Sequence, residues 1–209
     1  MKLKLLTLTT VSILSLTASA FAQVVNPSFE DPITFDGPPF VGSWEGFQGG
    51  GASAANSTLN PHTGLQSLML TITGTPNTFA GAFQDISVVG GTSYTFGGWD
   101  MSTSSPLSLG VELRIEWRNS VSNTEVSRTP NSTPIPLSSY SAFSLTADAP
   151  AGADIARIVY AVQSFSTSPL GDGVVFVDDI SFAPVPEPGT IALLSLGGLA
   201  LVALRRRQA

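Results

Sequence analysis

The stretch "VELRIEW", residues 111–117, decides the fold class of this 209-residue chain. Its apolar residues alternate strictly with charged ones: Val111, Leu113, Ile115 and Trp117 against Glu112, Arg114 and Glu116. Successive side chains of a β-strand point to opposite faces, whereas a helix repeats its apolar positions every three or four residues. The stretch therefore predicts a strand that faces a core on one side and solvent on the other.

Further apolar, β-rich runs lie on both sides of this stretch. They are "SLMLTIT" (residues 67–73), "ARIVYAV" (156–162) and "GVVFVDDISF" (173–182), separated by segments rich in Gly, Pro, Asp and Ser. No part of the chain between its two ends shows sustained helical periodicity. Repeated short strands with turn residues between them predict an all-β domain, an antiparallel β-sandwich over residues 23–183.

The N-terminal residues 1–22 have the three parts of a secretory signal peptide. Met1–Lys4 is basic, residues 5–16 are apolar apart from Ser and Thr, and Ala20 and Ala22 stand two apart as small residues do before a signal-peptidase cut. This order predicts export, with cleavage by signal peptidase after Ala22 or, alternatively, after Ala20.

The C-terminus carries a second apolar segment. Residues 191–204 are all apolar or small, and Arg205, Arg206 and Arg207 follow them directly. At about 1.5 Å per residue the segment is short for a hydrocarbon core of about 30 Å, but bilayers thin around short spans. The segment predicts a transmembrane helix that leaves the three arginines on the cytoplasmic side.

The order of parts in residues 184–209 resembles the PEP-CTERM sorting signal of Gram-negative bacteria. Pro186, Glu187 and Pro188 come first, then the apolar span, then the arginine cluster. The resemblance implies recognition by an exosortase, removal of the tail, and passage from the inner membrane to the cell surface or an extracellular matrix. It implies nothing about the activity of the exported domain.

Composition narrows the classes of partner. Residues 23–188 contain four arginines, no lysine and all fifteen acidic residues, a net charge of −11. Such a surface repels nucleic acid, whose binding rests on the neutralisation of phosphates. The chain has no cysteine, so no disulfide stabilises it although export would permit one.

The exported domain resembles the galactose-binding-like jelly roll of many carbohydrate-binding modules. The matching residues are Asn26, Phe29 and Glu30, then Gln84, Gly91 and Tyr94, and finally Asp178, Asp179 and Ile180. In such jelly rolls a structural calcium commonly joins the first strand to the last. The resemblance implies Glu30 and Asp178 as calcium ligands, with Asp179 as a substitute. Because Asp178 shares the parity of Ile180 and Phe182, we expect it to point inward, where it needs a partner.

The sequence does not assemble a catalytic set. His62, the one histidine, lies in the turn-like "LNPHTG", and there is neither cysteine nor a Gly-x-Ser-x-Gly motif. Glu112 and Glu116 are four residues apart, about 13 Å along a strand, which is too far for a glycosidase pair. We interpret them as part of a solvated charge ladder and predict that the protein is not an enzyme.

Aromatic residues are the candidates for ligand contact, since sugar rings stack on aromatic faces. Trp44, Trp99 and Tyr140 lie beside glycines or in loop-like stretches, although each could equally be a core residue. Trp117 and Phe96 are expected in the core. Two functions remain: a non-catalytic module that binds exopolysaccharide, or a structural protein of the envelope or biofilm matrix without a sugar ligand. An exposed row of aromatic residues would favour the first.

Overall fold

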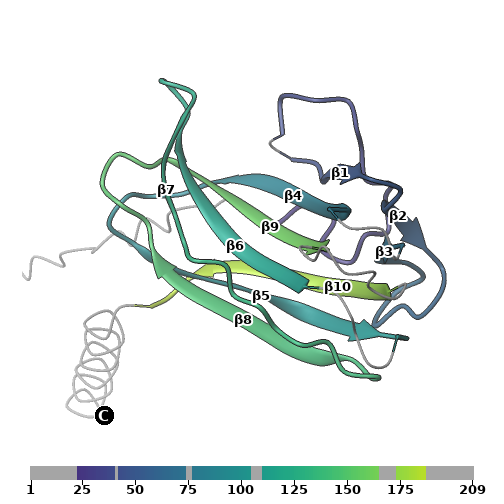
Figure 1. The fold of residues 1–209 in the computed structure, drawn as a ribbon. Coiled ribbons are helices and arrows are strands. Elements are labelled where there is room, and N and C mark those ends of the chain that lie inside the picture. Colours follow the sequence, from purple (N-terminus) through teal and green to yellow (C-terminus); the bar gives the residue numbers. More distant parts are fainter. Residues whose placement is uncertain (1–22, 41, 74–76, 105–109, 165–172, 187–209) are drawn as a thin grey trace, which may run out of the picture.

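The protein is a sandwich of two antiparallel five-stranded sheets (Figure 1). The structure is a computed structural model that describes residues 23–40, 42–73, 77–104, 110–164 and 173–186. One sheet has the strand order β1-β4-β9-β6-β7 and the other β2-β3-β10-β5-β8. The strands are β1 (Glu45–Gly49), β2 (Ser53–Ser57), β3 (Ser67–Ile72), β4 (Phe79–Ser87), β5 (Ser93–Ser102), β6 (Gly110–Asn119), β7 (Thr124–Arg128), β8 (Ser141–Asp148), β9 (Ile155–Gln163) and β10 (Gly173–Pro184). None of the described residues is helical, so the predicted all-β sandwich is confirmed.

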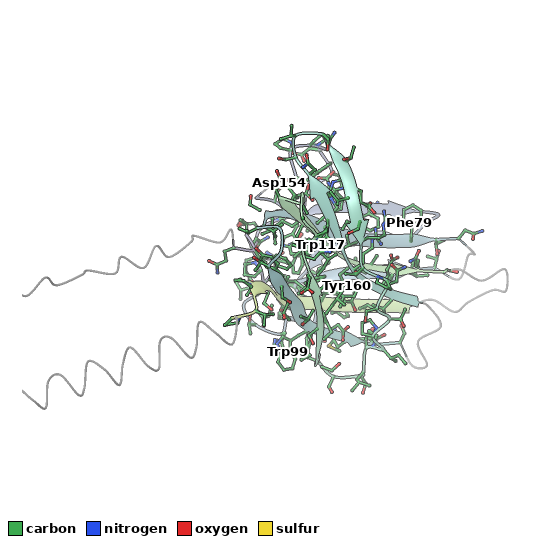
Figure 2. The ribbon with its side chains drawn as sticks, turned by 90° about the vertical axis from the view of Figure 1, so that its left-hand side faces the viewer. Phe79, Trp99, Trp117, Asp154 and Tyr160 are labelled. Atoms are coloured by element: carbon green, nitrogen blue, oxygen red, sulfur yellow. The ribbon has the colours of Figure 1, made fainter. Side chains whose placement is uncertain are left out.

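The core lies between the two sheets and follows from the alternation of the strands. The apolar residues of β6 point into it together with those of β3 and β9, and the large side chains at the centre are buried. Figure 2 shows Trp117 and Tyr160 in this interior. Trp99 of β5 lies instead on the outer surface of the β2-β3-β10-β5-β8 sheet, the lower sheet in Figure 1. Burial of such side chains contributes about 1.5 to 3 kcal/mol each, so the sandwich forms without disulfides.

The N-terminal segment is attached to both sheets. Gln84 of β4 is buried, accepts a hydrogen bond from the Val25 amide (2.8 Å) and donates one to the Val25 carbonyl (3.0 Å). The Ile180 amide of β10 donates to the Pro27 carbonyl at 2.9 Å. The glutamine that formed part of the sequence resemblance is therefore the internal anchor of the first residues of the domain.

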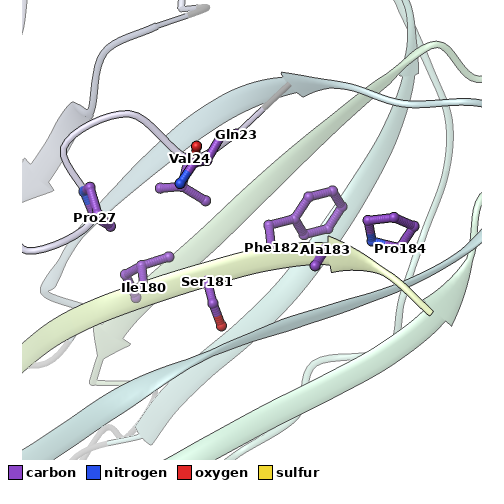
Figure 3. Close-up of a pocket in the computed structure, with 8 residues that line it drawn as sticks. All are labelled: Gln23, Val24, Pro27, Ile180, Ser181, Phe182, Ala183 and Pro184. Carbon is purple, nitrogen blue, oxygen red and sulfur yellow. The ribbon is translucent and has the colours of Figure 1, made fainter. Parts of the chain in front are cut away.

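A groove of about 480 Å³ opens where the two ends of the domain meet (Figure 3). The segment from Gln23 to Pro27 forms one wall, and the end of β10 from Ile180 to Pro184 forms the other. Its lining is mostly apolar, and no titratable side chain contributes to it.

The predicted signal peptide and the predicted transmembrane segment lie outside the described residues. Among the residues that are described, no helix is long and apolar enough to cross a membrane.

Candidate functional site

The outer face of the β1-β4-β9-β6-β7 sheet carries a row of four phenylalanines. Phe79 and Phe83 of β4, Phe47 of β1 and Phe40 of the preceding segment form this phenylalanine row. The ring centroids of Phe79 and Phe47 are 6.3 Å apart, those of Phe47 and Phe83 6.2 Å, and those of Phe83 and Phe40 4.9 Å. Phe79 is 42% exposed and the other three are half-buried. The row is a continuous aromatic surface that solvent can reach.

Glycines let two rings of the row lie flat on the sheet. A Cβ on Gly81 would come within 2.5 Å of Cζ of Phe47, and one on Gly49 within 2.6 Å of Cζ of Phe79. Real Cβ contacts are essentially never that short. The alternation of glycine and phenylalanine across β1 and β4 therefore places the aromatic rings directly above neighbouring backbone.

Arg157 of β9 closes one end of the row. Its Nε donates to Asp85 Oδ1 at 2.7 Å and its Nη2 to Oδ2 at 2.9 Å, a bidentate ion pair. Its guanidinium carbon also lies 4.2 Å from the ring centroid of Phe83 and 4.8 Å from that of Phe40. The ion pair and the two cation–π contacts hold the guanidinium plane in place.

A cleft of about 410 Å³ begins at this end of the row. Pro38, Pro39 and Phe40 form one wall, residues 118–120 and Asn123 at the β6–β7 turn form the other, and Asp85, Ile155 and Arg157 complete the lining. In Figure 1 the segment before β1 and the β6–β7 turn both stand above the upper sheet. The cleft therefore continues the phenylalanine row between two raised walls.

The turn that forms the second wall is fixed from below. The amide and hydroxyl of Ser120 donate to the two carboxylate oxygens of Asp154 at 2.7 and 2.5 Å. These hydrogen bonds lower the pKa of the exposed Asp154 carboxyl. The Asn119 side chain donates to the Gly152 carbonyl at 2.8 Å. The wall is thus tied to the β8–β9 connection.

The charge ladder of β6 lies on the same face. Its glutamates, Glu112 and Glu116, are both buried, so the prediction of a solvated ladder was wrong. Arg114 lies between them, bonded to Glu112 and, through Nε at 2.8 Å, to Glu116. Because β6 is an internal strand between β9 and β7, neighbouring side chains cover the two carboxylates. Gln163 of β9, for example, donates to Glu112.

A second cluster joins the N-terminal segment to β10 across loop 62–66, and we call it the carboxylate clamp. Glu30 Oε1 accepts the amides of Leu65 (2.8 Å) and Gln66 (3.1 Å). Asp178 Oδ2 accepts those of His62 (2.7 Å) and Thr63 (3.2 Å). All the predicted calcium ligands thus face this loop.

A bulge in β10 places Asp178 and Asp179 on the outer face of their sheet. The register of β10 against β5 shifts between Asp178 and Ser181, and Asp179 has a φ of 49°. Asp178 consequently lies opposite the exposed Trp99 instead of sharing the inward direction of Ile180. The expectation of an inward Asp178 was wrong, because strict alternation does not hold across a bulge.

Asp179 is the centre of the side-chain contacts of the clamp. It accepts hydrogen bonds from the hydroxyls of Ser28 (2.8 Å) and Thr63 (2.5 Å), and its Oδ2 lies 2.6 Å from Nδ1 of His62. Burial alone would raise its pKa, but these bonds outweigh burial and lower the pKa. Asp178 differs, since burial outweighs its backbone hydrogen bonds and raises its pKa.

Two of the predicted stacking residues meet at His62. The His62 ring is stacked on Trp99, with a centroid distance of 4.5 Å, and is tilted against Tyr140 at 4.8 Å. The Tyr140 hydroxyl donates to the Asn60 carbonyl at 2.6 Å, and burial raises the pKa of this hydroxyl to about 12. His62, expected to be a plain surface residue, thus covers part of Trp99. The role of Trp99 and Tyr140 in sugar stacking stays a prediction.

Trp44, the third predicted stacking residue, belongs to the core. It is 2% exposed, its ring lies 4.9 Å from that of Phe29, and its Nε1 donates to the Asn26 carbonyl at 3.0 Å. In this structure its ring is not accessible to a ligand. The nearby Gly42 suggested that a ligand could approach the ring, but the N-terminal segment with Asn26 and Phe29 packs against it.

The clamp fits hydrogen bonding better than calcium. Calcium takes six to eight oxygen ligands, whereas the groups that face Glu30 and Asp178 are backbone N–H donors. Among the described residues, no three carboxylate or histidine side chains are placed to hold a metal ion. These contacts do not test the predicted calcium at Glu30, Asp178 or Asp179, but the hydrogen bonds account for the clamp without an ion.

Chelation measures whether the clamp needs an ion. We expect the melting temperature of the domain to be the same with EDTA and with added calcium, because protein donors already satisfy the carboxylates. A bound ion at 100 times its dissociation constant would add about 2.7 kcal/mol. A fall of several degrees on chelation would therefore establish the ion.

Comparison with known proteins supports both parts of the sequence interpretation. Residues 184–207 match the PEP-CTERM protein-sorting motif, so the predicted sorting signal is confirmed. The motif implies an exported protein that is anchored at the membrane before cleavage by an exosortase. No curated protein sequence matches the chain.

The fold is that of carbohydrate-binding modules. The CBM22-1 xylan-binding domain of Paenibacillus barcinonensis Xyn10C is similar, with 14% identity and a TM-score of 0.52 over 81% of this chain and 99% of that one. A family 16 carbohydrate-binding module has 17% identity and a TM-score of 0.50, over 76% and 97%. The enzymatically active domain of bacteriophage CBA120 tailspike protein 4 has 17% identity and a TM-score of 0.57 over 78% of this chain. The match spans only 21% of the tailspike chain.

Proposed function

We propose that the protein is an exported, non-catalytic module that binds polysaccharide along the phenylalanine row. The observation that carries the proposal is the row itself, four aromatic rings in sequence on one face of the sandwich. Sugar rings present flat C–H faces that pack on aromatic rings, and a row can contact successive sugars of a chain. The cell surface or extracellular matrix, the destination implied by the sorting motif, is where such a chain would be met.

Charged side chains beside the row supply the polar contacts that a sugar needs. Arg157 and Asp85 lie at one end of the row, and Arg114 lies on β6 on the same face. Ion pairs hold all three side chains, so their donors and acceptors are already oriented. Val159 and Ala161 of β9 lie between the phenylalanine row and the charge ladder of β6, and both are buried under neighbouring side chains, which fill the space between the two. We therefore expect the polysaccharide to lie on the surface and not in a deep groove.

A purely structural role in the envelope or matrix is the alternative. It requires no accessible aromatic surface, which is why the row favours binding. Catalysis has less support, since Glu112 and Glu116 are buried and both are bonded to Arg114. Among the described residues, Asp100 is the other carboxylate with a raised pKa besides Asp178, and it is enclosed in the core.

Replacing Phe83 with alanine is expected to weaken polysaccharide binding about tenfold or more, the scale of a central aromatic contact. Phe83 is the variant of choice because it touches two other rings of the row and Arg157. The measurement is calorimetric titration of the signal-free, tail-free domain with polysaccharide from the producing cell. Far-UV circular dichroism and the melting temperature check that the variant is folded.

Phe35 provides the matched control. It is 53% exposed, lies against Gly46 instead of in the row, and should be replaceable by alanine without loss of affinity. Trp99→Ala tests the second aromatic surface in the same way. Equal losses for Phe35 and Phe83, or a wild-type domain that binds nothing, would leave the structural role as the better account.

A further inference from the structure

Every arginine of the exported domain lies on one face. Arg114, Arg118, Arg128 and Arg157 are the four basic residues between positions 23 and 188, where lysine is absent. In the register of β9, β6 and β7, Arg157 lies opposite Glu116, and Glu116 lies opposite Arg128. Arg114 and Arg118 share the parity of Glu116 along β6. All four therefore extend from the outer face of the sheet that carries the phenylalanine row.

This placement separates charge across the domain. The carboxylates that pair with the arginines are Asp85, Glu112, Glu116 and Glu125. Glu45 of β1, opposite Phe83, is a fifth carboxylate of this face, and among the described residues no arginine or lysine lies on any other face. A dissolved anion is repelled by most of such a surface. The face with the arginines is the one where it can approach.

Three of the four arginines are occupied by close carboxylates. Arg114 is bonded to Glu112 and Glu116, Arg128 forms a bidentate pair with Glu125, and Arg157 does so with Asp85. These pairs carry no surplus positive charge to an incoming ligand.

Arg118 differs from the other three. Its nearest carboxylate oxygen among the described residues, on Glu116, is 3.8 Å from its Nη1, beyond hydrogen-bonding distance. That glutamate is already held by Arg114 at 2.8 Å. Arg118 is also part of the lining of the cleft at the end of the phenylalanine row. Since Asp85 and Arg157 pair with each other, Arg118 is the charged side chain of the cleft lining without a carboxylate at hydrogen-bonding distance in the described structure.

We propose that the cleft selects an acidic polysaccharide, with Arg118 binding the carboxylate of a uronic acid residue. The inference rests on the proposed function and adds the class of sugar to it. A guanidinium presents parallel N–H donors that match the two oxygens of a carboxylate. Phe40 belongs both to the row and to the cleft. A chain stacked along the row would therefore bring its next residue to Arg118.

A matched pair of ligands tests the proposal. The probes are a β-1,4-linked glucuronic acid oligosaccharide and the product of reducing its carboxyl groups, the glucose oligosaccharide of the same length. The native domain should bind the acidic form about tenfold more tightly or better, as a charge-assisted bidentate contact would provide. Arg118→Gln should abolish this preference and leave the affinity for the reduced form unchanged.

Arg128→Gln is the control for a general loss of positive charge. Arg128 is on the same face and half exposed, but Glu125 pairs with it and it is not part of the cleft lining. This variant should keep the preference for the acidic form.

Equal affinity of the native domain for both oligosaccharides, or equal effects of the two arginine variants, would overturn the proposed selection of an acidic sugar. The phenylalanine row would remain as a binding site. If neither oligosaccharide binds but the cell's own polysaccharide does, glucuronate is not the acid recognised, and the proposed selection of a glucuronic acid chain is wrong. Failure of every glycan would instead contradict the proposed function.

Discussion

Replacement of Trp44 by alanine is expected to lower the free energy of unfolding by about 3 to 5 kcal/mol, the usual cost of truncating a buried aromatic residue. The ring is enclosed beside Phe29, and its indole N–H donates to the Asn26 carbonyl. Loss of both contacts would free the N-terminal segment. Because domains are stable by only about 5 to 15 kcal/mol, the effect should be plain in urea unfolding followed by fluorescence.

Trp99→Ala is the comparison that gives this result its meaning. Trp99 is 37% exposed and lies on the outer face of its sheet, so its truncation leaves little or no cavity. We expect a loss well below that of Trp44→Ala. Similar losses for the two variants, or a Trp44→Ala domain as stable as the native one, would contradict the assignment of Trp44 to the core.

The sequence was sufficient for the sandwich because alternation is a local property. The apolar residues of 111–117 face the core, as their alternation predicts. Trp117 and Phe96 are buried as expected. The sorting motif is equally local and could be read from consecutive residues. Neither conclusion depended on which strands become neighbours.

The site depended on that neighbourhood and could not be predicted. Phe40, Phe47, Phe79 and Phe83 lie in three separate segments, and only the pairing of β1 with β4 makes them a row. The glycines beneath Phe47 and Phe79 were visible as residues but not as partners. Once β1 was paired with β4 in register, the outward parity of Phe79, Gly81 and Phe83 would have been the available signal.

The misplaced carboxylates have the same origin. Glu112 and Glu116 seemed solvated because their strand pattern was amphipathic, yet an internal strand is covered on both sides by its neighbours. Asp178 has inward parity in a regular strand, and nothing in the residue pattern indicates the bulge at Asp179. In both cases the deciding contacts come from residues distant in the chain.

Asp100 supplies the second large effect, a stability that falls as the pH rises. It lies on β5 in the core, 1% exposed, and its partners are the hydroxyls of Tyr160 (2.7 Å) and Ser141 (3.3 Å). Neither partner is a cation. Burial outweighs the two hydrogen bonds and raises the pKa of Asp100, so the folded state holds the proton more tightly than the unfolded state does.

The sign of the effect follows from that difference. The stabilisation by the bound proton is complete below the unfolded-state pKa of about 3.9, and it is lost as the pH rises through the raised pKa of the folded state. Asp100→Asn carries no charge and keeps an oxygen that can accept the Tyr160 hydrogen bond. At neutral pH we expect this variant to be more stable than the native domain by about 1 to 3 kcal/mol. The advantage should shrink toward acid pH.

Asp179→Asn should show the opposite pH dependence and is the matched variant. The pKa of Asp179 is lowered in the folded domain, so its stabilisation is present above the unfolded-state pKa and lost as the pH falls through the folded-state value. Asparagine tolerates the positive φ at this position, which keeps the bulge. The Asp179→Asn domain should therefore be less stable than the native one at neutral pH and approach it in acid. Urea unfolding of the three proteins between about pH 3 and pH 8 gives the two difference curves. Curves of the same slope would contradict the assignment, because only a carboxyl buried without a cation should destabilise the fold when it ionises.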